Sequence, residues 1–148
     1  VAQSHADAEA FWELRDAIAE LLQAYAPTIN FDISFPISSI GRCVETLKEV
    51  MSSQFDGIRA MFFGHVGDGN IHVVVGPFPD EATGLAIETA FYEVVRNNEG
   101  SVSAEHGIGL HKKPWLPYSR SAAELHTLKL MKQALDPRNI LNPGKIQD

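Results

Sequence analysis

The amino-acid sequence predicts an α+β fold in which helices cover one face of an antiparallel sheet. Apolar side chains recur at spacings of three and four in several segments, which is the pattern of helices that bury one face. Shorter segments between them alternate apolar and polar residues or are rich in Val, Ile and Phe, as strands are. The two patterns follow one another in the order α-β-α-β-β-α-β-α. This order contains the βαββαβ unit of a ferredoxin-like fold, with extra helices at both ends of the chain.

The first part of the chain supplies two helices and one strand. Apolar residues at helical spacing run through residues 6–26, and Pro27 closes that helix. Residues 31–37 then alternate Phe and Ile with Asp, Ser and Pro, which predicts a strand with one buried face. A second helical pattern occupies residues 40–55 and ends before Gly57.

The second part supplies a hairpin, two helices and one more strand. In chain order, these elements are strands at residues 58–63 and 71–75, a helix through Ile87, Phe91 and Val94 that ends near Gly100, a strand at residues 101–104, and a helix over residues 125–135. Asp136 and Pro137 stop the last helix, because the residue before a proline disfavours the helical conformation.

Composition and charge favour one soluble domain over residues 1–148. Apolar residues make up 45% of the chain and charged residues 21%, which is ordinary for a globular protein. The net charge of −7 disfavours binding to nucleic acid or to an anionic membrane. Cys43 alone forms no internal disulfide, and no apolar run approaches the roughly 20 residues of a membrane helix. We expect a cytoplasmic protein, with any membrane association through partners, and a piece of a longer chain because the sequence begins with Val1.

The stretch GHVGDGNIH, residues 64–72, places two histidines around a glycine-rich turn. Asp68 and Gly69 favour a two-residue type I′ hairpin loop, and that loop would set His65 directly opposite His72 with Cβ atoms about 5 Å apart. Two imidazoles at this separation can bind one metal ion, as in zinc sites. The alternative is a polar hairpin whose histidines face solvent.

A third ligand would come from SAEHGIGLHKK, residues 103–113. Glu105 offers a carboxylate oxygen, and His106 beside it is able to titrate near neutral pH. Two histidines and one carboxylate leave coordination positions open, which is typical of catalytic metal sites. The alternatives are a solvated strand end for Glu105 and a hydrogen-bonded loop histidine for His106.

The motifs GHVGDGNIH, AEHGIGLHKK and DPRNILNPGK together resemble the C-terminal region of FAD-linked oxidases of the vanillyl-alcohol oxidase superfamily. The resemblance implies that His65, His72 and Glu105 bind a divalent metal, with zinc as the expected ion. It also implies that His106 is the base for the substrate hydroxyl. The substrate is then a small D-2-hydroxy acid whose hydride passes to FAD.

The resemblance assigns three further residues. Arg15 matches an arginine that binds the substrate carboxylate, for which a two-pronged guanidinium is suited. Asn142 and Lys145 match a tail that returns toward the flavin domain and are assigned to cofactor binding. Because the chain lacks the glycine-rich loops of a dinucleotide site, we expect FAD to be held mainly by an absent N-terminal domain. The isolated chain is then expected to be inactive and to bind no FAD.

Departures from the family pattern bear on the substrate. Relatives acting on dicarboxylic 2-hydroxy acids often carry Lys and Tyr where this chain has Asn30 and Phe31. They also place polar residues at the positions of Ala19 and Val74. We therefore expect a substrate with one carboxylate and a small or apolar tail, such as D-lactate or glycolate.

The sequence is also compatible with two other functions. One is a non-catalytic ferredoxin-like module whose histidines hold a structural metal or a regulatory ligand, and the other is a metallohydrolase with His106 as base. A homodimer is a further candidate partnership, and the electron acceptor that follows the flavin is left open.

Overall fold

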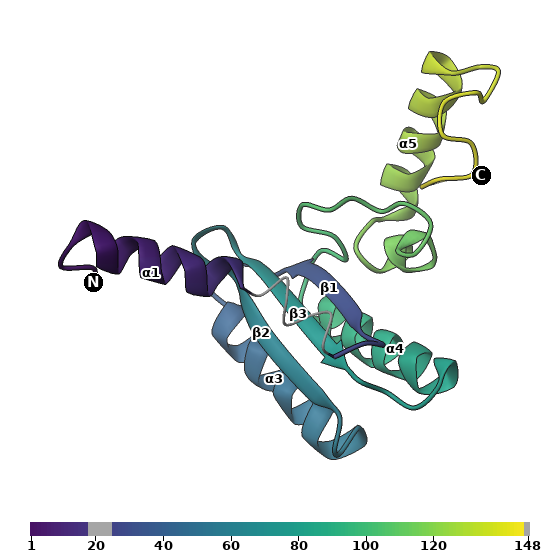
Figure 1. Ribbon diagram of the computed structural model, residues 1–148. Helices are drawn as coiled ribbons and strands as arrows, with labels where there is room; N and C mark the ends of the chain where they lie inside the picture. The colour runs from purple at the N-terminus through teal and green to yellow at the C-terminus, as the bar shows by residue number, and fades with distance from the viewer. Residues whose placement is uncertain (18–24, 147–148) are drawn as a thin grey trace.

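The computed structural model describes residues 1–17 and 25–146, with the backbone only for Val66. The predicted α+β class is confirmed: helices alternate with strands of one antiparallel sheet (Figure 1). The elements are α1 (His5–Asp16), β1 (Ile29–Ser34), α3 (Ile40–Gln54), β2 (Arg59–His65), the 3₁₀ turn η1 (Val66–Asp68), β3 (Asn70–Gly76), α4 (Glu81–Asn97), the 3₁₀ segment η2 (Lys113–Tyr118) and α5 (Ala122–Leu135).

The sheet has the order β1-β3-β2, and both pairings are antiparallel. Strand alternation sends Phe31 and Ile33 of β1, and Val73 and Val75 of β3, to the face covered by helices α3 and α4. Residues at the even positions of these two strands lie on the opposite face. The prediction that helices pack on one face is confirmed, and the opposite face is left for the site.

Local sequence explains why α3 and α4 form and where they pack. The buried residues of α3 recur at spacings of three and four, so that one side of the helix enters the core (Ile40, Cys43, Leu47 and Met51). In α4 the Asp80 side chain accepts a hydrogen bond from the Thr83 N–H at 2.7 Å, which caps the first turn. Phe91 of α4 stacks on Phe31 with ring centroids 4.5 Å apart.

The terminal helices do not contribute to this core. Helices α1 and α5 contain no buried residue, and both project away from the sheet (Figure 1). A capping box between Ser121 and Glu124 defines the start of α5. Residues 18–24 of the predicted first helix lie outside the described residues. Within the described ranges, no helix is both long and apolar enough to cross a membrane.

The predicted strand at residues 101–104 is wrong. The segment keeps two backbone attachments to β1, an isolated bridge between Ser101 and Ser34 and a hydrogen bond from the Ala104 N–H to the Asp32 carbonyl at 3.1 Å, and forms no regular strand. The chain then bends, because the backbone N–H groups of Ala104, Glu105 and His106 donate to the side chain of Asp32. The described sheet therefore has three strands, and the segment after Ser101 forms a loop over the sheet face opposite the helices.

Candidate metal and active site

The site lies on the open face of the sheet, where three residues form a row across the strands. Asp32 of β1 pairs with His72 of β3, which pairs in turn with Phe63 of β2. This face is opposite the helices, yet Asp32 is 0% exposed. The loop that follows Ser101 covers it, and the row thereby becomes the floor of a partly enclosed polar site.

The Asp32 carboxylate collects donors from the whole loop. The backbone N–H groups of Ala104, Glu105 and His106 approach Asp32 Oδ2 at 3.1, 3.2 and 2.9 Å. The Ser103 hydroxyl donates to the same oxygen at 3.0 Å, and the Lys112 ammonium lies 3.1 Å from it. All five donors converge on Oδ2, whereas Oδ1 accepts the Glu105 N–H at 3.3 Å and lies 3.8 Å from His72 Nδ1.

The ionised form of Asp32 is strongly favoured. Burial alone would raise the pKa of this carboxyl, because desolvation penalises the charged form. The hydrogen bonds from the His106 N–H, the Lys112 ammonium and the Glu105 N–H outweigh the burial. They lower the pKa of Asp32 from the ordinary 3.8 to about 2.

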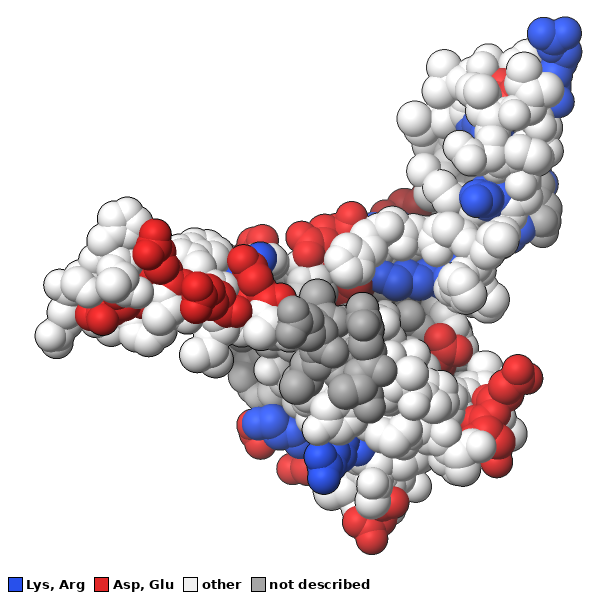
Figure 2. Space-filling model, viewed as in Figure 1, with Lys and Arg blue, Asp and Glu red and all other residues white. Residues whose placement is uncertain are grey.

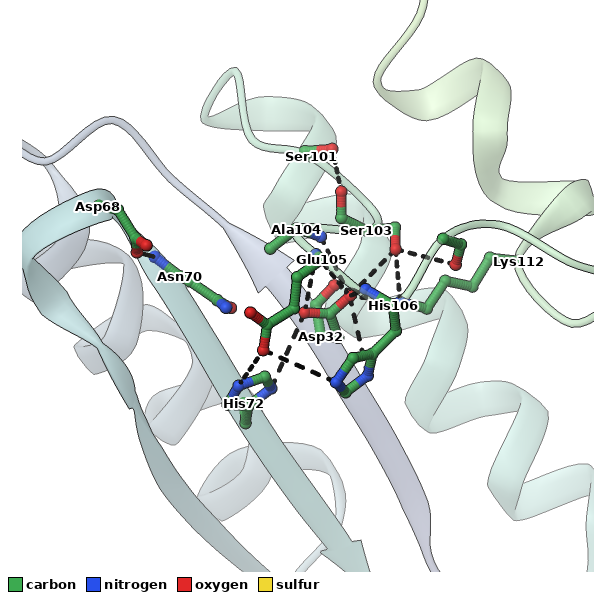
Figure 3. Close-up of polar contacts among 11 residues, drawn as sticks. Asp32, Asp68, Asn70, His72, Ser101, Ser103, Ala104, Glu105, His106 and Lys112 are labelled. Atoms are coloured by element: carbon green, nitrogen blue, oxygen red, sulfur yellow. Dashed lines mark hydrogen bonds and ion pairs between the residues drawn. The ribbon is translucent and has the colours of Figure 1, made fainter.

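Three side chains converge in front of this floor (Figure 3). Glu105 Oε1 lies 3.0 Å from His72 Nε2 and 3.7 Å from His106 Nε2. The rings of His72 and His106 stack, with centroids 5.2 Å apart and planes at 17°. One donor atom from each of Asp32, His72, Glu105 and His106 lies within 4.8 Å of all the others. Two imidazoles and an accessible carboxylate form a donor set that suits a divalent metal such as zinc.

The predicted hairpin register is wrong, although His65 still shares the face of His72. Residues 66–69 form the connection, so His65 pairs with Asn70, and His72 pairs with Phe63. The Asp68 carboxylate accepts the Asn70 N–H at 3.1 Å, and the Gly69 carbonyl accepts the N–H of Phe35 at 3.1 Å. His65 is thus a diagonal neighbour of His72, with ring centroids 5.9 Å apart. It lies outside the group of four whose donor atoms converge.

The sequence pattern of the family described as FAD linked oxidases, C-terminal domain, matches residues 1–146. The chain belongs to this family.

Relatives of this FAD-linked oxidase domain are longer proteins. A D-2-hydroxyglutarate dehydrogenase of Stutzerimonas stutzeri is 34% identical over 99% of the chain and 32% of its own length. A mitochondrial D-2-hydroxyglutarate dehydrogenase of Arabidopsis thaliana is 36% identical over 99% of the chain and 26% of its own length. A mitochondrial protein of Schizosaccharomyces pombe, provisionally named as a D-lactate dehydrogenase, is 34% identical over 98% of the chain and 30% of its own length. The chain thus spans between about a quarter and a third of these relatives.

The other residues assigned from the family resemblance do not meet at the site. Arg15 lies on α1, a helix that carries many acidic side chains (Figure 2), and its guanidinium pairs with Asp16 at 2.9 Å. The Arg15 side chain is 61% exposed. Asn142 and Lys145 lie in the tail after α5, where the Lys145 N–H donates to the Asn142 carbonyl at 3.3 Å. Their assigned roles toward substrate and flavin stay predictions.

The tail nevertheless contacts the loop that carries the site. The Lys113 ammonium donates to the Gly144 carbonyl at 2.9 Å, and the Ile146 N–H donates to the Gly109 carbonyl at 3.3 Å. These bonds join the NPGK segment to residues 107–113. The two motifs, which are far apart in sequence, therefore belong to one local unit.

The sequence alone assigned no role to Asp32 or to Lys112. Asp32 looked like the polar half of an alternating strand, for which solvent exposure is the simplest expectation. The one local signal was an acidic residue between Phe31 and Ile33, both of which are buried. The signal can be interpreted only when the loop from residue 103 to residue 112 is known to cover Asp32.

Proposed function

We propose that the chain is the substrate- and metal-binding domain of an FAD-dependent dehydrogenase that oxidises a D-2-hydroxy acid. The observation that carries this proposal is the convergence of His72 from β3 with Glu105 and His106 from the loop, in a domain of the FAD-linked oxidase family. The flavin, held mainly by an N-terminal domain outside this chain, supplies the hydride acceptor.

The metal ligands in this proposal are His72 and Glu105, whose donor atoms converge, and His65, whose ring centroid lies 5.9 Å from that of His72 and which would turn toward the ion. Asp32 Oδ2 is taken up by the loop donors and Oδ1 lies 3.8 Å from His72 Nδ1, so Asp32 is assigned to orienting the loop and His72 rather than to the ligand set. A divalent ion at this position, with zinc proposed, supplies Lewis acidity toward the substrate hydroxyl and carboxylate. The site is open on one side, since the side chain of Glu105 is 47% exposed. This openness favours a catalytic site over a structural one, which is usually closed by four protein ligands.

His106 is the proposed general base. Its side chain is 61% exposed, so the imidazole can meet a substrate that enters from the open side. Stacking on His72 and the backbone N–H bond to Asp32 hold the residue at the edge of the ligand set. The proton from the substrate hydroxyl would pass to an imidazole nitrogen of His106.

A cleft beside His106 supplies the argument about substrate charge. It has a volume of about 530 Å³, within the usual range for small-ligand sites, and its lining includes Asn30, Glu88 and His111. Burial raises the pKa of the Glu88 carboxyl, and the nearby His111 partly offsets this effect. The one ammonium among the described lining residues, that of Lys112, is held by Asp32, so the lining offers no free Lys or Arg to a second substrate carboxylate. We therefore propose D-lactate or glycolate rather than D-2-hydroxyglutarate.

Kinetics on the full-length protein test the substrate. The proposal expects kcat/KM for D-lactate or glycolate to exceed kcat/KM for D-2-hydroxyglutarate. Preference for D-2-hydroxyglutarate would overturn the substrate assignment. This acid is the alternative to test first, because two of the relatives are named for it.

Metal analysis tests the site itself. The full-length protein should contain about one divalent ion per chain, and His72→Ala should lose both the ion and turnover. His126→Ala is the matched control, because His126 is an exposed residue on α5. Equal metal content in all three proteins would contradict the ligand assignment. Full metal retention without hydroxy-acid turnover would instead favour the non-catalytic metal-binding module.

Stoichiometric flavin absorbance of the 148-residue chain alone would contradict an FAD site held mainly elsewhere.

A further inference from the structure

We infer that Asp32 and Lys112 are positioning residues of this site. Their buried ion pair fixes the loop from residue 103 to residue 112, so that Glu105 and His106 both face His72. The inference rests on the proposed function only in what the site binds, since the contacts that hold the loop involve the protein alone.

Asp32 fastens the loop at both of its ends. Ser103 and Lys112 are nine residues apart in sequence, yet both donate to Asp32 Oδ2, at 3.0 and 3.1 Å. The segment between them, which includes Gly107 and Gly109 with positive φ, therefore closes on a single carboxylate. Asp32 also pairs with His72 across the strands, so the loop is attached beside the imidazole that its side chains must meet.

The backbone of the turn depends on this carboxylate as well. The N–H groups of Ala104, Glu105 and His106 all donate to Asp32. Because successive N–H groups point at one acceptor, the chain curls around it instead of continuing as a strand. The Glu105 and His106 side chains are then carried to the same side, where they reach His72.

Lys112 is held too fully to bind substrate. Its side chain is 12% exposed, and the ammonium approaches Asp32 Oδ2 at 3.1 Å, the Asp32 carbonyl at 3.2 Å and Ser103 Oγ at 3.0 Å. An ammonium has three N–H donors, so these three acceptors account for all of them. Lys112 therefore neutralises Asp32 and ties the end of the loop to β1, and the uncompensated negative charge of the cluster is that of Glu105.

Three variants of the full-length protein separate positioning from general stability. Asp32→Asn puts an amide donor among the loop donors, and Lys112→Met leaves the buried carboxylate without its cation. Asp80→Ala is the control, because it also removes a carboxylate that accepts a backbone N–H, but at the start of α4. The readouts are hydrogen exchange of the amides at residues 104–106, zinc affinity by chelator competition, and kcat with KM.

In Asp32→Asn, amide exchange at residues 104–106 should accelerate at least about tenfold, and zinc affinity should fall by about 10- to 100-fold, the usual effect of losing a group that orients ligands. Lys112→Met should show the same changes in smaller measure, with Lys112→Arg closer to the parent because the charge is kept. kcat should fall more than KM rises, since His106 is misaligned while the cleft is retained. Asp80→Ala should leave all these values within about twofold.

Parent-like exchange and zinc affinity in Asp32→Asn would overturn the inference, and so would equal losses in Asp80→Ala. If Asp32→Asn does not fold, Lys112→Met and the milder Ser103→Ala, which deletes one donor to Asp32, decide by the same criteria. If the parent protein binds no divalent ion, the proposed metal site fails. The exchange of the turn amides still tests the positioning role in that case.

Discussion

Acid should remove a defined part of the folding stability through Asp32. The pKa of this carboxyl falls from 3.8 to about 2 on folding: burial opposes the change, and the hydrogen bonds from His106, Lys112 and Glu105 outweigh it. One pKa unit corresponds to about 1.4 kcal/mol, so the depressed pKa contributes about 2 kcal/mol to the free energy of unfolding. Because burial of the carboxylate penalises its charged form, about 2 kcal/mol is the upper bound of this contribution.

The direction with pH follows from the lower pKa in the folded state. Above about pH 5 both the folded and the unfolded chain keep Asp32 ionised, and the contribution is fully present. As the pH falls from about 5 to 2, the unfolded chain takes up the proton first, and most of the contribution is lost. The Asp32→Asn variant lacks this contribution of the Asp32 carboxylate at every pH. The difference in unfolding free energy between parent and variant should therefore shrink by about 2 kcal/mol across this interval.

Urea unfolding of the 148-residue chain and its Asp32→Asn variant, at pH values from 6 to 2 with chelator present, measures this difference. Taking the difference between the two proteins matters, because the pKa values of Asp80, Glu124 and Asp136 are also lowered by hydrogen bonds. These groups act alike in both proteins, since distant sites contribute additively. A difference that stays constant from pH 6 to pH 2 would refute the assignment of a depressed pKa to Asp32.

The remaining predictions concern the scaffold of the site. Phe91→Ala should lower the unfolding free energy by about 3 to 5 kcal/mol in denaturant titration, because it empties a stacked core position; a loss below 1 kcal/mol would contradict this packing. Ser121→Ala should cost about 1 kcal/mol by breaking its capping box with Glu124 and leave zinc affinity unchanged, and a drop in affinity would link α5 to the site. Gly69→Ala should cost more than about 1 kcal/mol, since its φ is +82° and the new Cβ would lie 2.3 Å from a carbonyl oxygen. Gly67→Ala, where nothing lies within 4 Å, is its control, and equal thermal stability of the two would show that the turn is not constrained as described.

Local periodicity was enough to predict most of the fold. The buried spacing in α3 and the alternation in β1 are both visible in the sequence, because each depends on residues a few positions apart. The motif spacing also led to His72, Glu105 and His106, whose donor atoms converge. These successes share one cause: the signal and the structure that it specifies lie within the same segment.

The errors arose where distant segments decide the conformation. The Asp68-Gly69 pair favours a two-residue loop locally, but the Gly69 carbonyl accepts the N–H of Phe35 from the end of β1, and the connection becomes longer. That contact spans more than thirty residues. Asp32 was missed for the same reason, since its burial is created by residues more than seventy positions later. Neither partner is identifiable from the local pattern alone.

The failure of the predicted strand at residues 101–104 bears directly on the proposed chemistry. Had the chain continued as a strand through residue 106, alternation would have sent the adjacent Glu105 and His106 side chains to opposite faces of the sheet. Only one of them could then have reached His72. The bend around Asp32 keeps one backbone bond, from the Ala104 N–H to the Asp32 carbonyl, and otherwise directs the N–H groups of the turn to the Asp32 carboxylate. A buried ion pair seldom adds much stability compared with apolar packing, so the role of the Asp32–Lys112 pair is to orient the loop. It lets two neighbouring residues present a ligand and a base to the same imidazole.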